Sequence, residues 1–170
     1  MSEVRRAIRR HIESNPGVHF NELARNLGIA TGQAQYHLRR LRRAGGLDTA
    51  KVRDRTHYFP EGYDPWEQRT IALLRRETVR GIIVAALEEP EPSAADLATD
   101  LDVARSTVSW HVSTLVDAGV AEKCYDEHGR SHIRLTRPDE TRRLLDEVSP
   151  SAPDRLVDRF TRLVDDALLE

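Results

Sequence analysis

The feature that most constrains the fold of this chain is an internal repeat. Residues 19–45 align with residues 93–119 at an offset of 74, and residues 55–58 align with residues 130–133 at an offset of 75. The eight identical pairs of the longer match are Leu23/Leu97, Ala24/Ala98, Leu27/Leu101, Ala30/Ala104, His37/His111, Leu41/Leu115, Ala44/Ala118 and Gly45/Gly119. Because a solenoid usually needs three or more units, a repeat that occurs twice predicts two copies of one small domain.

Each copy has the pattern of three helices followed by a hairpin. In the first copy, Val4, Ile8 and Ile12 recur at i, i+4 and i+8, which predicts an amphipathic helix. The following segments predict a short helix over 21–27, a tight turn over 28–30, a longer helix over about 31–44, and a hairpin formed by 47–52 and 56–59. The second copy repeats this order, with the third helix ending at 118–119 and a hairpin formed by 120–125 and 130–135.

Two further helices are expected outside the repeat. Asp64, Pro65 and Glu67 have the spacing of a capping box with proline in the first turn, which predicts a helix start. We expect this helical stretch to run towards Leu87 with a break near Thr78, and we expect a last helix after residue 151. The predicted domains are therefore a first one at 1–62, a linker helix and second one at 63–138, and a C-terminal helical segment at 139–170.

Helix, tight turn, helix and hairpin are, in that order, the parts of a winged helix-turn-helix. In this fold the third helix enters the major groove of DNA and the hairpin, or wing, reaches neighbouring phosphates. We therefore expect a mostly α protein with small β-hairpin wings and two such domains in tandem. The residues predicted to bind DNA are Thr31, Gln33, Gln35, Tyr36, Arg39, Arg40, Arg43, Arg53, Arg55, Arg105, Ser106, Thr107, Ser109 and Arg130. Tyr36 and Trp110 are equally compatible with contact to another subunit.

The distribution of charge favours a polyanionic partner for the first copy. The net charge of the chain is −2, yet residues 1–60 carry twelve basic and five acidic side chains. The outer face of the third helix is arginine-rich in the first copy, whereas in the second copy it carries hydroxyl groups and a single charged residue, Arg105. A basic part joined to an acidic remainder is typical of nucleic-acid binding by the basic part. An ordinary solvated helix face is the alternative interpretation of the arginines.

The helix-turn-helix segments resemble those of a known group. Residues 28–41, GIATGQAQYHLRRL, and residues 103–115, VARSTVSWHVSTL, are similar to the corresponding segments of archaeal tandem winged-helix transcriptional regulators. The single modules are similar to those of the ArsR and MarR families. The resemblance covers roughly residues 4–136 and implies promoter binding as a dimer. One departure is that Ala30 and Ala104 stand where these modules usually carry serine as the cap of the third helix.

An apolar stripe near the C-terminus predicts a homodimer. The stripe is too wide for a lone solvated helix, so another surface must cover it. We expect a second chain to do so, with packing inside one chain as the alternative. The predicted dimer residues are Leu156, Phe160, Leu163, Val164 and Ala167.

Other classes of function have less support. The sequence contains no motif of a catalytic nucleophile, a phosphate-binding loop or a metalloprotease, so we expect no enzymatic activity and no cofactor. Cys124, His128 and His132 are too loosely spaced to predict a metal site, and we expect His37 and His111 to be packed inside their domains.

The expected location is the cytoplasm, in association with the nucleoid. The chain has no apolar run of about 20 residues, and its first residues lack the apolar stretch of a secretory signal.

The alternative function is that of a tandem winged-helix scaffold that binds proteins of the transcription or chromosome machinery.

Overall fold

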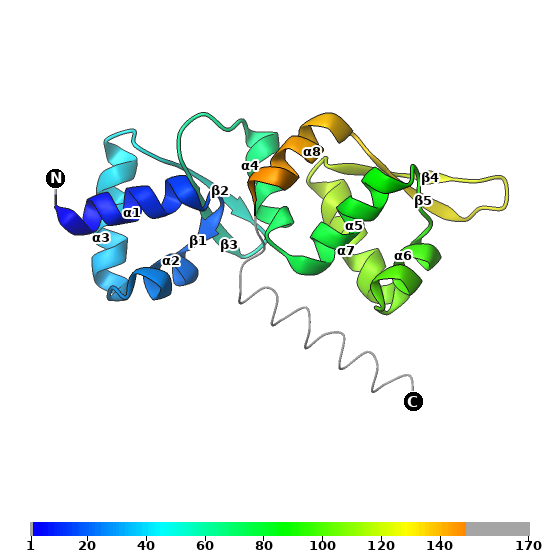
Figure 1. The fold of residues 1–170 in the computed structure, drawn as a ribbon, viewed down its shortest axis with the longest axis horizontal. Coiled ribbons are helices and arrows are strands. Elements are labelled where there is room, and N and C mark those ends of the chain that lie inside the picture. The colour runs from blue at the N-terminus through cyan, green and yellow to red at the C-terminus, as the bar shows by residue number, and fades with distance from the viewer. Residues whose placement is uncertain (1, 149–170) are drawn as a thin grey trace. The chain divides into compact units, whose positions relative to one another are not determined.

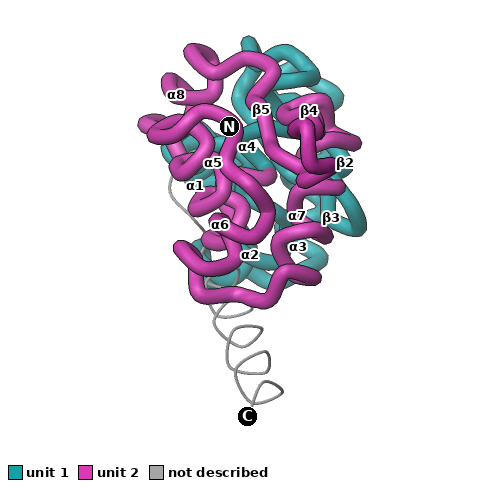
Figure 2. The backbone as a smooth tube through the Cα atoms, turned by 90° about the vertical axis from the view of Figure 1, so that its right-hand side faces the viewer, with its two compact units in different colours: residues 1–72 teal, residues 73–170 magenta. Residues whose placement is uncertain are grey.

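The computed structural model describes residues 2–148. The chain divides into two compact units, residues 1–72 and 73–170 (Figure 2). Each unit contains one copy of the repeat.

The repeat copy in the first unit consists of three helices and a three-stranded antiparallel sheet (Figure 1). Its elements are α1 (Glu3–Ser14), β1 (Val18–His19), α2 (Phe20–Leu27), α3 (Thr31–Arg43), β2 (Asp48–Val52) and β3 (Arg55–Phe59). The strand order is β1-β3-β2, and both Val18 and Thr49 pair with Tyr58 of the central strand. β1 was not expected from the sequence, because two residues are too short to show an alternating pattern.

Local interactions explain where the helices of this unit begin and end. The hydroxyl of Ser2 accepts a hydrogen bond from the backbone N–H of Arg5 and so caps α1. The ring Nδ1 of His19 accepts one from the N–H of Glu22 and caps α2. Gly28 ends α2 with a φ of +62°, a conformation that glycine adopts at no steric cost, and this turn allows α3 to start three residues later.

The core of the first unit is built from the inner faces of its three helices. The stripe predicted from the sequence is confirmed, since Ile8 and Ile12 are fully buried and Val4 packs against the same cluster. The other buried members are Val18, Leu23, Leu38, Leu41 and Leu47. These contacts hold α3 against α1 and leave its opposite face in solvent.

The second unit repeats the arrangement with a two-stranded hairpin and one additional helix (Figure 1). Its elements are α5 (Glu77–Glu88), α6 (Ala94–Leu101), α7 (Arg105–Asp117), β4 (Ala121–Tyr125), β5 (Ser131–Leu135) and α8 (Pro138–Glu147). Ser93 caps α6, because the N–H of Asp96 donates to its hydroxyl. Arg80 of α5 fixes the end of α8 by donating to the carbonyl oxygens of Leu145 and Val148.

A histidine fixes the same loop in both units. His57 Nδ1 lies 2.7 Å from the carbonyl oxygen of Gly17, and His132 Nδ1 lies 2.8 Å from that of Glu91. The two histidines are equivalent in the repeat, and so are the two residues whose carbonyls they contact. Both of those residues have a positive φ, 81° for Gly17 and 59° for Glu91. Because a carbonyl oxygen only accepts hydrogen bonds, Nδ1 must carry the proton in each case.

α4 (Pro65–Leu74) leads from the first unit into the second and starts as the sequence predicts. The N–H of Glu67 donates to Asp64 Oδ1 at 2.8 Å, and the N–H of Asp64 donates to Glu67 Oε2 at 2.9 Å. The break in the following helical stretch lies at 75–76, slightly before the expected position near Thr78. No glycine or proline marks the break, so the sequence alone does not fix its position.

The expected fold class is confirmed: the protein is mostly α with small β-hairpin wings and contains two tandem winged helix-turn-helix domains. The described part of the expected C-terminal segment forms α8. The domain boundaries at 62/63 and 138/139 stay predictions.

Candidate nucleic-acid interface

The outward face of α3 gathers the residues that the sequence predicts to bind DNA. Ala34, His37, Leu38 and Leu41 are buried on the inner face of the helix. All seven predicted residues of this helix are exposed on the other face, namely Thr31, Gln33, Gln35, Tyr36, Arg39, Arg40 and Arg43. The face therefore presents amide, hydroxyl and guanidinium groups, which are the groups that contact base edges and phosphates.

One pair on this face is ordered by contacts of its own. Arg40 donates a hydrogen bond of 2.8 Å to the hydroxyl of Tyr36, and its guanidinium lies 5.7 Å from the centre of the Tyr36 ring. Neither contact removes the positive charge of Arg40. The pair therefore places a cation at the surface in a defined position.

The start of α3 lacks a side-chain cap. Ala30 occupies the cap position, and no side chain accepts a hydrogen bond there. Ala104 leaves the start of α7 in the same state, whereas α1, α2 and α6 are all capped. Alanine in place of the usual serine therefore removes the side-chain cap of α3. This leaves backbone N–H groups at the start of the helix available to a ligand.

His37 is buried on the inner face of α3 and edge-on to the Tyr36 ring. Burial lowers the pKa of His37, and the positive charges of Arg5 and Arg40 lower it further. His111, at the equivalent position of α7, is also buried. Both histidines are packed, as the sequence predicts. Among the described residues, no three His, Cys, Asp or Glu side chains are grouped so that they could hold a metal ion.

The wing of the first unit carries two more of the predicted residues. Arg53 and Arg55 flank the turn between β2 and β3, and both are exposed. Arg53 has a φ of +56°, so the turn passes through the left-handed region at a residue other than glycine.

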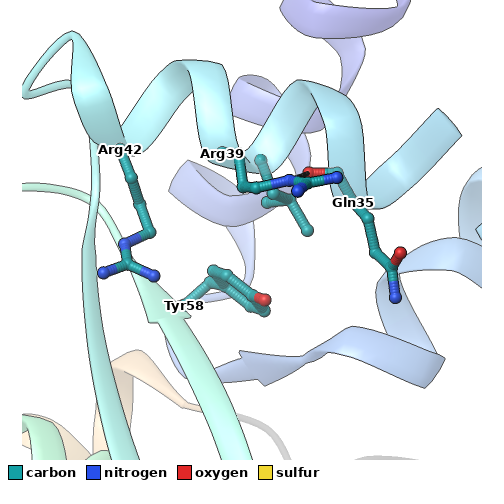
Figure 3. A pocket seen from close by; sticks show the side chains of 5 residues that line it. Gln35, Arg39, Arg42 and Tyr58 are labelled. Carbon is teal, nitrogen blue, oxygen red and sulfur yellow. Dashed lines mark hydrogen bonds between the residues drawn. The ribbon is translucent and has the colours of Figure 1, made fainter. Parts of the chain in front are cut away.

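Sequence reasoning missed two residues, Arg42 and Tyr58. Together with Gln35, Leu38 and Arg39 they line a groove of about 350 Å³ between α3 and the hairpin. Figure 3 shows Arg39 and Arg42 extending from α3 and Tyr58 on the strand below them. The helical pattern places Arg42 at the edge of the exposed face, but only the folded hairpin brings Tyr58 opposite it. A second hollow, of about 320 Å³, is lined by Arg39, Arg42 and Arg43.

Within the described part of the chain, no carboxylate neutralises three of the arginines of α3. Within residues 2–148, Arg39, Arg42 and Arg43 form no ion pair with a carboxylate. The whole of residues 1–72 carries thirteen basic and eight acidic side chains, a balance of +5. Exposed cations without an internal counter-charge attract a polyanion from solution.

The second unit presents a different surface at the equivalent places. On α7, Arg105, Ser106 and Ser109 are exposed and Thr107 is half-buried. Trp110 stands where α3 has Tyr36 and is 47% exposed, with the guanidinium of Arg76 5.5 Å from the ring centre.

Carboxylates pair with most of the cations at the wing and α8 of this unit. Residues 73–148 carry ten basic and fifteen acidic side chains. The ion pairs are Arg130–Asp126 at 2.7 Å, Arg134–Glu91 at 2.6 Å, Arg134–Glu122 at 3.2 Å, Arg137–Glu140 at 4.0 Å and Arg143–Glu147 at 3.5 Å. The predicted DNA contact Arg130 is thus already bound to a carboxylate.

Asp126 also holds His132 in the wing of the second unit. Its Oδ2 lies 3.1 Å from His132 Nε2, and its Oδ1 accepts from the backbone N–H groups of His128 and Arg130. The hydrogen bond to Asp126 raises the pKa of His132, and the bond to the Glu91 carbonyl adds to this effect. In turn, the hydrogen bond from His132 and the backbone N–H of Arg130 lower the pKa of Asp126.

The predicted dimer residues Leu156, Phe160, Leu163, Val164 and Ala167 lie outside the described residues. No helix within residues 2–148 has the length and apolar character needed to span a membrane.

The fold and the exposed third helices define a tandem winged helix-turn-helix protein. Two family models match the chain, an N-terminal HTH domain over residues 2–71 and a helix-turn-helix domain over residues 79–124. The chain is similar to an uncharacterized HTH-type transcriptional regulator from Methanocaldococcus jannaschii, with 29% identity over 122 residues. The resemblance to tandem winged helix-turn-helix regulators is therefore confirmed.

The match covers 72% of this chain and 31% of the archaeal relative, so the chain spans about a third of the relative's length. Among solved structures, the DIP2311 protein from Corynebacterium diphtheriae is 18% identical, and the match covers 79% of this chain and 26% of that one. Its TM-score of 0.30 is too low for the likeness to support any further argument.

Proposed function

We propose that the protein is a transcriptional regulator that binds specific sites in double-stranded DNA. α3 of the first unit enters the major groove, and the β2–β3 wing lies on the adjacent backbone. The observation that carries the proposal is the exposed set Arg39, Arg42 and Arg43, which has no carboxylate partner among the described residues. DNA supplies the missing counter-charge and releases its own counterions in exchange.

Each part of the α3 surface has a role in this proposal. Gln33 and Gln35 read adenine edges, because an amide offers both a donor and an acceptor. Arg40 and Arg43 contact guanine edges or phosphates. The uncapped N–H groups at the start of the helix, after Ala30, add a site for a phosphate.

The second unit serves mainly to join two chains and adds little affinity for DNA phosphates. Its wing arginines would have to exchange a carboxylate for a phosphate, which gains no additional ion pair. The apolar stripe around Phe160 and Leu163 joins two chains, so that two first units act on one DNA molecule. Holding the two units together raises their effective concentration and hence the affinity.

Chromatin immunoprecipitation across the genome, followed by titration of the recovered site, tests DNA recognition. We expect the recovered duplex to bind at least about 10³-fold more tightly than a scrambled duplex at physiological salt. Equal affinity for both duplexes would remove specific recognition from the proposal.

Sedimentation of the full chain tests the dimer. Burying one apolar side chain contributes about 1.5–3 kcal/mol, so Phe160→Asp combined with Leu163→Asp should convert a dimer to a monomer. A wild-type chain that sediments as a monomer at micromolar concentration would contradict the proposed assembly.

A protein-interaction scaffold is the second candidate function. It is favoured by the paired charges of the second unit and by the exposed ring of Trp110, an aromatic side chain of the kind enriched in protein interfaces. For a scaffold, immunoprecipitation would recover no preferred DNA sequence, and cross-linking would join α7 to one fixed protein partner.

A further inference from the structure

The groove between α3 and the hairpin of the first unit has the composition of an anion site. Gln35, Arg39 and Arg42 recur at i, i+4 and i+7, so they form one row along the wing-facing side of α3. Tyr58 of β3 faces this row from the hairpin (Figure 3). Leu38 also lines the groove and contributes an apolar wall. Two guanidinium groups and one phenol therefore converge on a single hollow.

The donors in this groove are available to a ligand. Arg39 donates from Nε to the carbonyl oxygen of Gln35 in a long bond of 3.4 Å, which leaves its terminal N–H groups free of that contact. Arg42 forms no ion pair with a described residue. Burial raises the pKa of Tyr58, although the charge of Arg42 opposes the rise, so the phenol is a hydrogen-bond donor at neutral pH.

We propose that this groove is a phosphate site, in which Arg39 and Arg42 together neutralise one phosphate and the hydroxyl of Tyr58 donates to it. A guanidinium presents parallel N–H groups that match two oxygens of a phosphate. The groove shares Arg39 and Arg42 with the hollow that extends to Arg43. Two adjoining hollows that three arginines line fit a chain of phosphates better than a single compact metabolite.

The phosphate belongs to the DNA strand that passes between α3 and the wing. When α3 lies in the major groove, a sugar-phosphate strand borders the helix on the side of the hairpin. This step rests on the proposed function and deepens it, because it assigns Arg42 and Tyr58 to the backbone that fixes the register of α3. A free phosphate-bearing molecule is the other source of the same chemistry, and the test separates the two.

Salt-dependent DNA titrations of the full chain test the DNA source. If the two arginines share one phosphate, Arg39→Ala combined with Arg42→Ala should reduce the slope of log K against log salt by about 0.9, not twice that amount. Tyr58→Phe should weaken binding about ten-fold, since a hydrogen bond to a charged group is lost, and should leave the slope unchanged. Arg42→Lys should keep the slope, because lysine keeps the positive charge. It should weaken DNA binding, because an ammonium group lacks the parallel N–H groups of a guanidinium.

Arg6→Ala combined with Arg10→Ala is the matched control. It removes the same two charges from exposed positions of α1 in the same unit, and its slope should stay that of the wild type. Thermal melting of each variant verifies the fold, since all the altered side chains except Tyr58 are exposed.

Titration with inorganic phosphate at constant ionic strength, without DNA, tests the other source. Saturable phosphate binding that Arg42→Ala abolishes, together with unchanged DNA slopes, would keep the phosphate site and assign it to a free molecule. If the wild-type chain binds no DNA, the proposed function fails and this titration alone decides the site. Unchanged DNA slopes together with no phosphate binding would overturn the site.

Discussion

Replacing Arg40 and Arg43 with alanine should make DNA binding weaker and less dependent on salt. Both side chains are exposed on α3 outside the phosphate groove, and the hydrogen bond from Arg40 to Tyr36 leaves the charge in place. If each guanidinium neutralises one phosphate, the slope of log K against log salt falls by about 1.8. That change corresponds to roughly 60-fold weaker binding at 0.1 M salt and roughly 20-fold at 0.2 M.

The fold should tolerate this double substitution. Alanine has the highest helix propensity, which offsets part of the loss of favourable charges in the last turn of α3. We expect the free energy of unfolding to change by less than about 1 kcal/mol. Fluorescence anisotropy with one labelled duplex at four or more salt concentrations measures the slope, and thermal melting measures the stability.

The second unit offers a control with the same change in net charge. Arg134 and Arg143 are paired with carboxylates, so Arg134→Ala combined with Arg143→Ala should leave the slope unchanged. If instead Arg40→Ala combined with Arg43→Ala retains the wild-type slope and melts normally, the exposed face of α3 does not meet phosphates. Equal slope changes in both double variants would show that net charge, and not position, controls the affinity.

Two further predictions concern local structure. Ala30→Ser supplies the missing acceptor at the start of α3 and should raise the free energy of unfolding by about 1 kcal/mol in urea titrations, whereas an unchanged value would mean that the N–H groups already have a partner. Because the pKa of His132 is raised above 6.5, its bond to Asp126 stabilises the wing fully below pH 6.5, and this contribution is lost as the pH rises through the raised pKa. Asp126, whose pKa is lowered from 3.8, contributes above pH 3.8 and loses its contribution only as the pH falls through the lowered value. Titration of the His132 ring by NMR should show this raised pKa, and Asp126→Asn should bring it back towards 6.5; a pKa that the substitution leaves in place would contradict the pairing.

The helices of both units could be predicted from the sequence because their apolar spacing is preserved in both copies. Ile8 and Ile12 mark the inner face of α1, and Leu41 and Leu115 mark the same turn of α3 and α7. Burial at these positions is a local property of the helix period, so no knowledge of the tertiary fold is needed.

The features that were missed depend on residues far apart in the chain. β1 exists because Val18 and His19 pair with β3, about 40 residues further along. Tyr58 becomes part of the groove for the same reason, since its strand is brought back beneath α3. The histidine bonds of His57 and His132 belong to this class too, although the repeat aligned those two residues and could have suggested a shared role.

The position of Glu91 connects the backbone of the second unit with the charge of its wing. Gly17, its equivalent in the first unit, has no side chain, whereas the carboxylate of Glu91 binds Arg134 at 2.6 Å. Glu91 also holds a positive φ that glycine adopts without strain. In genetic terms, glutamate and glycine codons differ by a single base, so the two residues at this position are one base change apart. A Glu91→Gly change would relieve the backbone and leave Glu122, at 3.2 Å, as the remaining carboxylate partner of Arg134, so the turn of the chain and the charge of the wing would change together.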